Sequence, residues 1–156
     1  MTYVFDTSPL STLFRNYYPT TFKTLWSNFD ALVAAGDVVS TREVLREIHD
    51  GPVAELVAWS KDHEELFAMP TGAEAAFVAQ IYGIPHFQQN IEQQKLLKGG
   101  RNADPFVIAR AAVEKRTVVT MELLKPKAAK IPNICQHFNV KCLTLQEFMH
   151  DQGWVF

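Results

Sequence analysis

The sequence predicts a single α/β domain over residues 1–156, built around a mostly parallel sheet. Short apolar segments typical of buried strands alternate along the chain with longer segments of helical periodicity. This order is expected where helical crossovers join parallel strands. The length fits one domain. Hydrophobic residues make up 47% of the chain and charged residues 21%, a globular balance that argues against disorder.

The first half of the chain begins with a predicted strand over residues 2–6, TYVFD, where β-branched and aromatic residues precede a polar stop. A helix is expected from Ser8-Pro9, because Ser is a good N-cap and Pro is favoured in the first helical turn. Apolar residues three and four positions apart predict another helix over 20–35. The other expected elements are a strand at 38–39, a helix from Ser40 or Thr41 to about His49, a helix at 53–61 and a strand at 66–69.

The second half is predicted to contain the most buried helix of the domain. Asp104-Pro105 opens a helix over 105–115 that is apolar nearly all round, and such a helix is normally buried. Two earlier helices, at 72–82 and 86–97, are separated by the breaker Gly83-Ile84-Pro85. The remaining expected elements are a loop at 98–103, a strand at 117–120, a helix at 131–138, a strand at 140–143 and a helix at 145–151.

The composition excludes several classes of protein. Lys plus Arg is 15 and Asp plus Glu is 17, so the formal charge is −2. This excludes a strongly basic protein that wraps nucleic acid, but not a nucleic-acid enzyme whose metal ions supply positive charge. Two cysteines are too few for a disulfide framework or a structural zinc site. The first residues do not resemble a signal peptide, and no apolar run approaches the ~18 residues that span a membrane. We therefore expect a cytoplasmic protein with no membrane partner.

Two nucleotide-binding classes and one phosphatase class are also disfavoured by motif. The sequence contains neither the GxxxxGK[ST] of P-loop nucleotide hydrolases nor the GxGxxG of dinucleotide-binding domains. A phosphatase of the haloacid dehalogenase type would need a second Asp two residues after Asp6, where Ser8 stands.

Four acidic residues fall where predicted strands end or where the next helices begin. Asp6 ends the first strand, Glu47 lies on the helix after the second, Asp104 opens the buried helix, and Glu122 follows the strand at 117–120. Ligands of open parallel sheets bind beyond the carboxyl ends of the strands. Carboxylate oxygens suit Mg²⁺, and clustered carboxylates repel one another unless cations neutralise them. The pattern therefore predicts an acidic, metal-binding pocket.

Each of these residues also has a structural interpretation that the sequence leaves open. Asp6 could hydrogen-bond the backbone of the turn that follows it. Asp104 could be the N-cap of the helix that Pro105 begins. Glu47 could lie on a solvated helix face, and Glu122 could be an exposed loop residue.

The acidic residues lie in four blocks that occur in a familiar order. The blocks are YVFDTSPL, with an Asp after the opening strand; VLREI, with a helical Glu; ADPFVIARA, where an Asp starts a buried helix; and VVTMELL, where an acidic residue follows a Thr by two positions. Together they resemble the PIN-domain family of metal-dependent ribonucleases over nearly the whole chain. The tail KIPNICQHFNVKCLTLQEFM is similar to a branch of small PIN-like proteins of bacteria and archaea related to VapC-type toxins. The resemblance implies a three-layer α/β/α fold.

The resemblance also implies hydrolysis of RNA phosphodiester bonds with Mg²⁺ or Mn²⁺. It places the catalytic acidic quartet at Asp6, Glu47, Asp104 and Glu122. Asp6 and Asp104 would be the main metal ligands, and Glu47 would be a ligand or orient the attacking water. Glu122 would act through an intervening water, because the family more commonly has the shorter Asp there. The supporting residues would be the hydroxyls of Ser8 and Thr120, which fix carboxylates, and Glu43, which lies one helical turn from Glu47 and could take its role.

Partners follow from the same resemblance. RNA needs positive charge around an acidic centre. Two basic residues, Lys98 and Arg101, lie just before Asp104, and three more lie just after Glu122: Lys125, Lys127 and Lys130. The family implies the toxin of a toxin–antitoxin pair, with an antitoxin protein as partner and a homodimer as assembly. The rival hypothesis is a catalytically inactive PIN-like module for binding or assembly, which would not take up Mn²⁺.

Overall fold

The computed structural model describes residues 1–98 and 102–156. Within these residues, one parallel five-stranded sheet runs in the order β3-β2-β1-β4-β5. Its strands are β1 (Tyr3–Phe5), β2 (Val38–Thr41), β3 (Phe67–Ala68), β4 (Thr117–Val119) and β5 (Cys142–Leu143). In the register, Val4 of β1 lies beside Val39 of β2 and Val118 of β4. The predicted parallel sheet is therefore confirmed, with the first strand at its centre.

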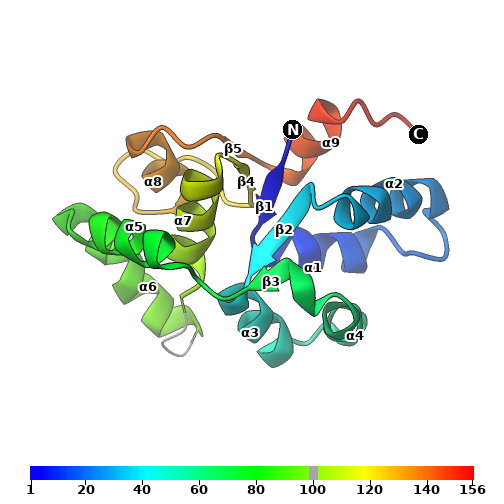
Figure 1. The fold of residues 1–156 in the computed structure, drawn as a ribbon, viewed down its shortest axis with the longest axis horizontal. Coiled ribbons are helices and arrows are strands. Elements are labelled where there is room, and N and C mark those ends of the chain that lie inside the picture. The colour runs from blue at the N-terminus through cyan, green and yellow to red at the C-terminus, as the bar shows by residue number, and fades with distance from the viewer. Residues whose placement is uncertain (99–101) are drawn as a thin grey trace.

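Helices cover both faces of this sheet, so the fold has the three α/β/α layers that were expected (Figure 1). One side carries α5 (Gly72–Tyr82), α6 (Gln88–Lys98), α7 (Asp104–Glu114) and α8 (Ile131–His137). The other side carries α1 (Thr7–Asn16), α2 (Lys23–Ala34), α4 (Ala54–Asp62) and α9 (Leu145–Asp151). α3 (Arg42–Asp50) directly follows the carboxyl end of β2, and short 3-10 turns occupy Glu64–Leu66 and Pro85–Phe87. No helix in the described ranges is both long and apolar enough to cross a membrane.

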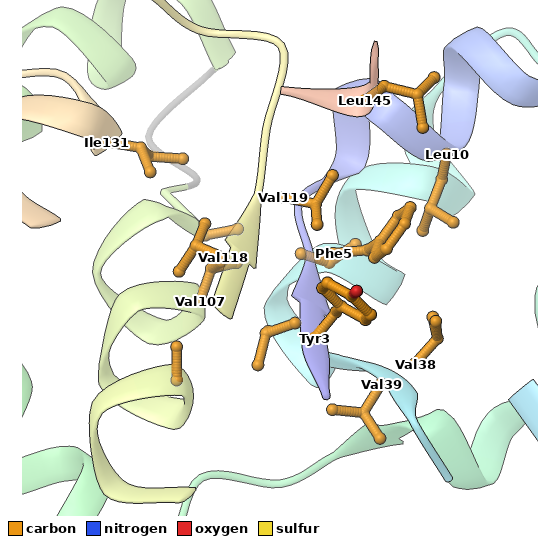
Figure 2. Close-up of a cluster of buried hydrophobic side chains, with 14 of the residues drawn as sticks. Tyr3, Phe5, Leu10, Val38, Val39, Val107, Val118, Val119, Ile131 and Leu145 are labelled. Atoms are coloured by element: carbon orange, nitrogen blue, oxygen red, sulfur yellow. The ribbon is translucent and has the colours of Figure 1, made fainter. Parts of the chain in front are cut away.

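The core is divided by the sheet into two apolar layers (Figure 2). Val118 points to one side, where Val107 of α7 and Ile131 of α8 lie, and α7 packs directly on the strands. Phe5 points to the other side. Its ring meets Phe29 edge-on at a centroid distance of 5.6 Å and Phe148 at 5.0 Å. These contacts hold β1 rigidly between helices, and β1 is the strand that presents Asp6.

Several element boundaries differ from the predictions for identifiable reasons. The first helix starts at Thr7 rather than at Ser8-Pro9, with Asp6 in the N-cap position. The last strand is only Cys142–Leu143 because Asn139 takes a left-handed conformation (φ 56°) and turns the chain before Val140. Thr41 caps α3 as expected, since its Oγ1 accepts a hydrogen bond from the Val44 amide at 3.2 Å.

Candidate functional site

A cavity of about 870 Å³ opens at the end of the sheet where β1 and β4 terminate. Its wall comes from three segments that are far apart in sequence: the start of α1, the end of α3 and the segment after β4. The lining residues are Asp6, Thr7, Ser8, Glu47, Asp50, Gly51, Pro52, Met121, Glu122, Leu123, Lys125 and Lys130. Three of the four predicted acidic residues, Asp6, Glu47 and Glu122, therefore share one cavity at the carboxyl edge of a parallel sheet, where such folds bind ligands.

Asp6 is held by the chain that follows β4. Its backbone N–H donates to the Val119 carbonyl at 2.9 Å, which continues the ladder between β1 and β4. Its carboxylate Oδ2 accepts hydrogen bonds from the hydroxyls of Thr120, at 3.1 Å, and Ser8, at 3.4 Å. The carboxylate makes no capping bond to the α1 backbone. Asp6 is only 4% exposed, so these hydroxyls fix a nearly buried carboxylate.

Thr120 joins Asp6 to the turn that carries Glu122. The same Oγ1 that donates to Asp6 accepts a hydrogen bond from the Glu122 backbone N–H at 3.2 Å. Ser8 acts in parallel, since its Oγ accepts from the Met121 N–H at 3.3 Å. Glu122 itself is half-buried, and its Oε2 accepts from the Ile131 N–H at the start of α8 over 2.8 Å. Glu122 is therefore built into the fold and is not an exposed loop residue.

Glu47 and Glu43 occupy the same helix but different environments. Glu47 lines the cavity, and its Oε1 accepts a hydrogen bond of 2.6 Å from the Thr7 hydroxyl. Glu43 is 9% exposed, lies outside the cavity wall and is 3.4 Å from the Arg42 guanidinium. The structure thus separates the two glutamates, with Glu47 at the predicted site.

Asp104 is completely buried and lies outside the cavity wall. The sequence alternative that made it the N-cap of the helix is wrong, because Asp104 is the first residue of α7 and Ala103 occupies the cap position. Its Oδ2 instead accepts a hydrogen bond of 2.9 Å from Nδ2 of Asn90, and its N–H donates to Oδ1 of Asn102 at 3.2 Å. The carboxylate is thus used in tertiary contacts.

Cys135 is a thiol whose pKa is affected by two of the predicted carboxylates, Asp104 and Glu122. This thiol is buried on α8, and its pKa is raised well above the usual value, first by side-chain contact with Cys142 and then by burial. The negative charges of Glu122 and Asp104 raise the pKa further. Asp104 and Glu122 therefore act electrostatically on the same buried thiol, although only Glu122 reaches the cavity wall.

Basic residues flank the acidic wall on the segment after β4. Lys125 and Lys130 line the cavity, and exposed Lys127 lies between them in a left-handed conformation (φ 61°). Arg101 and the side chain of Lys98 lie outside the part of the chain that the structure describes.

The cavity wall offers the kind of ligand atoms that a divalent cation needs. Carboxylate and hydroxyl oxygens are the ligands that Mg²⁺ and Mn²⁺ favour, and the cavity presents them from Asp6, Glu47 and Glu122. Among the described residues, no three acidic, histidine or cysteine side chains already form a metal-holding group. The residues therefore fit a cation held by one or two carboxylates and its own water molecules, which is common for Mg²⁺.

Sequence reasoning named Ser8 and Thr120, which bind Asp6, but it missed two other residues that position carboxylates. Thr7 binds Glu47, and Asn90 binds Asp104. Thr7 could have been noticed, because it directly follows Asp6 at the start of a helix. Asn90 gave no signal, because it lies in a helix of mostly polar residues, where burial of one amide is decided by tertiary packing.

Comparisons with known proteins agree with this fold. A family model described as "Domain of unknown function (DUF4411)" matches residues 3–156. A search of curated proteins finds no match. Among the solved structures that match is a chain of VapBC2 from Rickettsia felis, whose crystal structure was determined bound to a DNA fragment from the promoter. It is 15% identical, covers 92% of this chain and 98% of its own length, and has a TM-score of 0.54. This likeness shows a PIN-like fold, and the family match shows that the chain belongs to the DUF4411 family.

Proposed function

We propose that the protein is a metal-dependent endoribonuclease that hydrolyses RNA phosphodiester bonds. The observation that carries this proposal is the convergence of Asp6, Glu47 and Glu122 on one cavity at the carboxyl edge of the sheet. Hydroxyl groups orient two of these carboxylates, from Thr120 on Asp6 and from Thr7 on Glu47. Such outer partners are typical of sites in which carboxylates must hold a fixed geometry.

In this proposal Asp6 and Glu47 would hold Mg²⁺ or Mn²⁺ from the cavity wall, and Asp104, which is buried outside that wall, would be the third carboxylate ligand. A divalent cation supplies a more acidic bound water and stabilises the leaving oxygen in phosphodiester hydrolysis. The chain itself would orient the reacting groups. Glu47, fixed by Thr7, faces the cavity in which an attacking water would lie. Glu122 would act through a water, since its Oε2 already accepts the Ile131 N–H.

The basic rim would bind the substrate backbone. Lys125 and Lys130 line the same cavity as the carboxylates, and Lys127 lies on the same segment. Lysines that line the cavity beside the carboxylates can neutralise phosphates on either side of a scissile bond without entering the acidic centre. Lys98 and Arg101 would also bind the RNA backbone.

The biological role that we propose is the toxin of a toxin–antitoxin pair, acting in the cytoplasm as a homodimer restrained by an antitoxin. The likeness in fold to a chain of VapBC2 supports this role. A short neighbouring reading frame encoding a DNA-binding protein that co-purifies with this chain would support it further. The role would be contradicted if this chain and the product of that neighbouring reading frame did not associate.

The test compares two glutamates on one helix. Glu47→Gln and Glu43→Gln remove the same charge one turn apart, and each protein is checked for folding by circular dichroism. With Mn²⁺ and an RNA mixture, we expect Glu47→Gln to cleave more than about a hundredfold more slowly than the wild type, while Glu43→Gln stays close to it. Equal cleavage by wild type and Glu47→Gln would refute the site. A folded wild type that binds no Mn²⁺ would support the binding or assembly module instead.

A further inference from the structure

A buried amide on α6 contacts two parts of the candidate site at once. Asn90 is 2% exposed, and its Nδ2 donates to Oδ2 of Asp104 at 2.9 Å and to the carbonyl of Ala129 at 3.0 Å. Ala129 lies on the segment after β4, two residues before Ile131, whose N–H binds Glu122. One side chain from α6 therefore reaches both a buried carboxylate and the segment that carries a second one.

The orientation of this amide is fixed by its neighbours. Oδ1 of Asn90 accepts a hydrogen bond of 2.7 Å from Nδ2 of Asn102, and Oδ1 of Asn102 accepts the Asp104 N–H at 3.2 Å. Asn102 also donates to the Tyr82 hydroxyl at 3.2 Å. An asparagine amide has two donor hydrogens and one acceptor oxygen. Because the oxygen faces Asn102, both donor hydrogens are directed at Asp104 and Ala129.

This arrangement is more specific than burial of Asp104 requires. A buried carboxylate must be hydrogen-bonded, but any donor would meet that need. Here the donor comes from a different helix, is itself locked by Asn102, and also ties down the segment after β4. An amide locked in this way fixes the rotation of the Asp104 carboxylate and the distance between that carboxylate and the Glu122 segment.

We propose that Asn90 is a positioning residue, which orients the Asp104 carboxylate for cation binding and couples it to the segment that carries Glu122. The proposal rests on the proposed function, because it takes Asp104 as a ligand. Partners that orient metal-binding carboxylates typically change metal affinity or activity by about 10–100-fold when they are removed.

The test replaces the amide by an apolar side chain with the same branching at Cγ. Asn90→Leu removes the donors, and Gln89→Leu, at the exposed neighbouring position of α6, is the matched control. Mn²⁺ affinity is measured directly by electron paramagnetic resonance, without RNA. We expect Asn90→Leu to bind Mn²⁺ about 10–100-fold more weakly and Gln89→Leu to bind it as the wild type does. In RNA cleavage, kcat should fall for Asn90→Leu, while Gln89→Leu should keep the wild-type kcat.

A second measurement needs no substitution and covers the case in which Asn90→Leu fails to fold. In the wild type, the Asn90 side-chain amide resonances should shift when Mg²⁺ is added, with the dissociation constant that calorimetry gives for Mg²⁺. Saturation with Mg²⁺ that leaves these resonances in place would overturn the proposal, as would a folded Asn90→Leu protein with wild-type Mn²⁺ affinity. A wild type that binds Mn²⁺ but cleaves no RNA would refute only the nuclease, and one that binds no cation would refute both.

Discussion

Thr120→Val removes the hydroxyl that joins Asp6 to the turn after β4 while keeping the shape of the side chain. Thr120 is fully buried, and its Oγ1 makes one bond to the Asp6 carboxylate and one to the Glu122 N–H. A hydrogen bond to a charged group contributes about 1.5–3 kcal/mol, and leaving a buried donor unsatisfied costs about 1–3 kcal/mol. Both bonds are longer than the usual hydroxyl distance. We therefore take the lower end of each range and expect a loss of about 2–3 kcal/mol in the free energy of unfolding.

Urea unfolding followed by circular dichroism measures this loss as a lower midpoint with an unchanged slope. The same loss corresponds to a melting temperature lower by about 4–12 °C for a chain of this size. Thr120→Ser is the matched control, because it keeps the hydroxyl and loses only a methyl group, worth about 1 kcal/mol.

A double-mutant cycle with Asp6→Ala isolates the hydroxyl–carboxylate bond. We expect the two substitutions to be non-additive by at least about 1 kcal/mol, because the residues are in contact. Additivity within about 0.5 kcal/mol, or a smaller loss for Val than for Ser, would show that the hydroxyl does not hold Asp6 in solution.

Three further outcomes are expected. Asp104→Asn keeps an oxygen acceptor for Asn90, so the melting temperature without metal should stay within about 4 °C of the wild-type value. Mn²⁺-dependent RNA cleavage should fall more than about a hundredfold, and equal cleavage by the two proteins would show that the carboxylate is not used. Mn²⁺ at about 100 times its Kd should add about 2.7 kcal/mol to the free energy of unfolding, and an unchanged calorimetric transition would favour a non-enzymatic module. Burial and the hydrogen bond to Asp151 raise the pKa of Tyr3 from 10.0 to about 12, so the folded state favours the neutral phenol. Stability from this group is present below pH 10 and is lost as the pH rises from 10 to 12. Tyr3→Phe should remove that part of the alkaline loss, and superimposable alkaline unfolding curves for the two proteins would contradict the assignment.

The architecture could be predicted because local pattern and tertiary role agree in the central elements. β1 and β4 are β-branched and aromatic segments that are buried on both faces, and the apolar sequence of α7 matches its position against the sheet. The Asp104-Pro105 pair misled the prediction of where α7 begins. Asp is a common N-cap residue, but the Asp104 carboxylate instead accepts a hydrogen bond from Asn90 of α6.

The candidate site was predictable only as far as strand ends could be located. Asp6 ends one predicted strand and Glu122 follows another by two residues, so the fold class alone implies that they meet at one edge of the sheet. Glu43 and Glu47 are four residues apart on one helix, and periodicity cannot distinguish them. The two residues differ in their position along α3. Glu47 is one turn closer to the end of the helix, where it meets Thr7 of α1. That contact depends on packing between helices, and local sequence does not specify it.

The pairing of β1 with β4 has a consequence for when the acidic cavity can exist during protein synthesis. Thr120, which holds the Asp6 carboxylate, lies 114 residues later in the chain, and the Val119 carbonyl that binds the Asp6 N–H directly precedes it. A nascent chain that has emerged from the ribosome only as far as α6 contains Asp6 and Glu47 but neither of these partners. Asp6, Glu47 and Glu122 can meet only after Glu122 has emerged, so a growing polypeptide has no assembled cavity before that point. If the cavity cleaves RNA, the message being translated is exposed to a finished site only after the codon for Glu122 has been read.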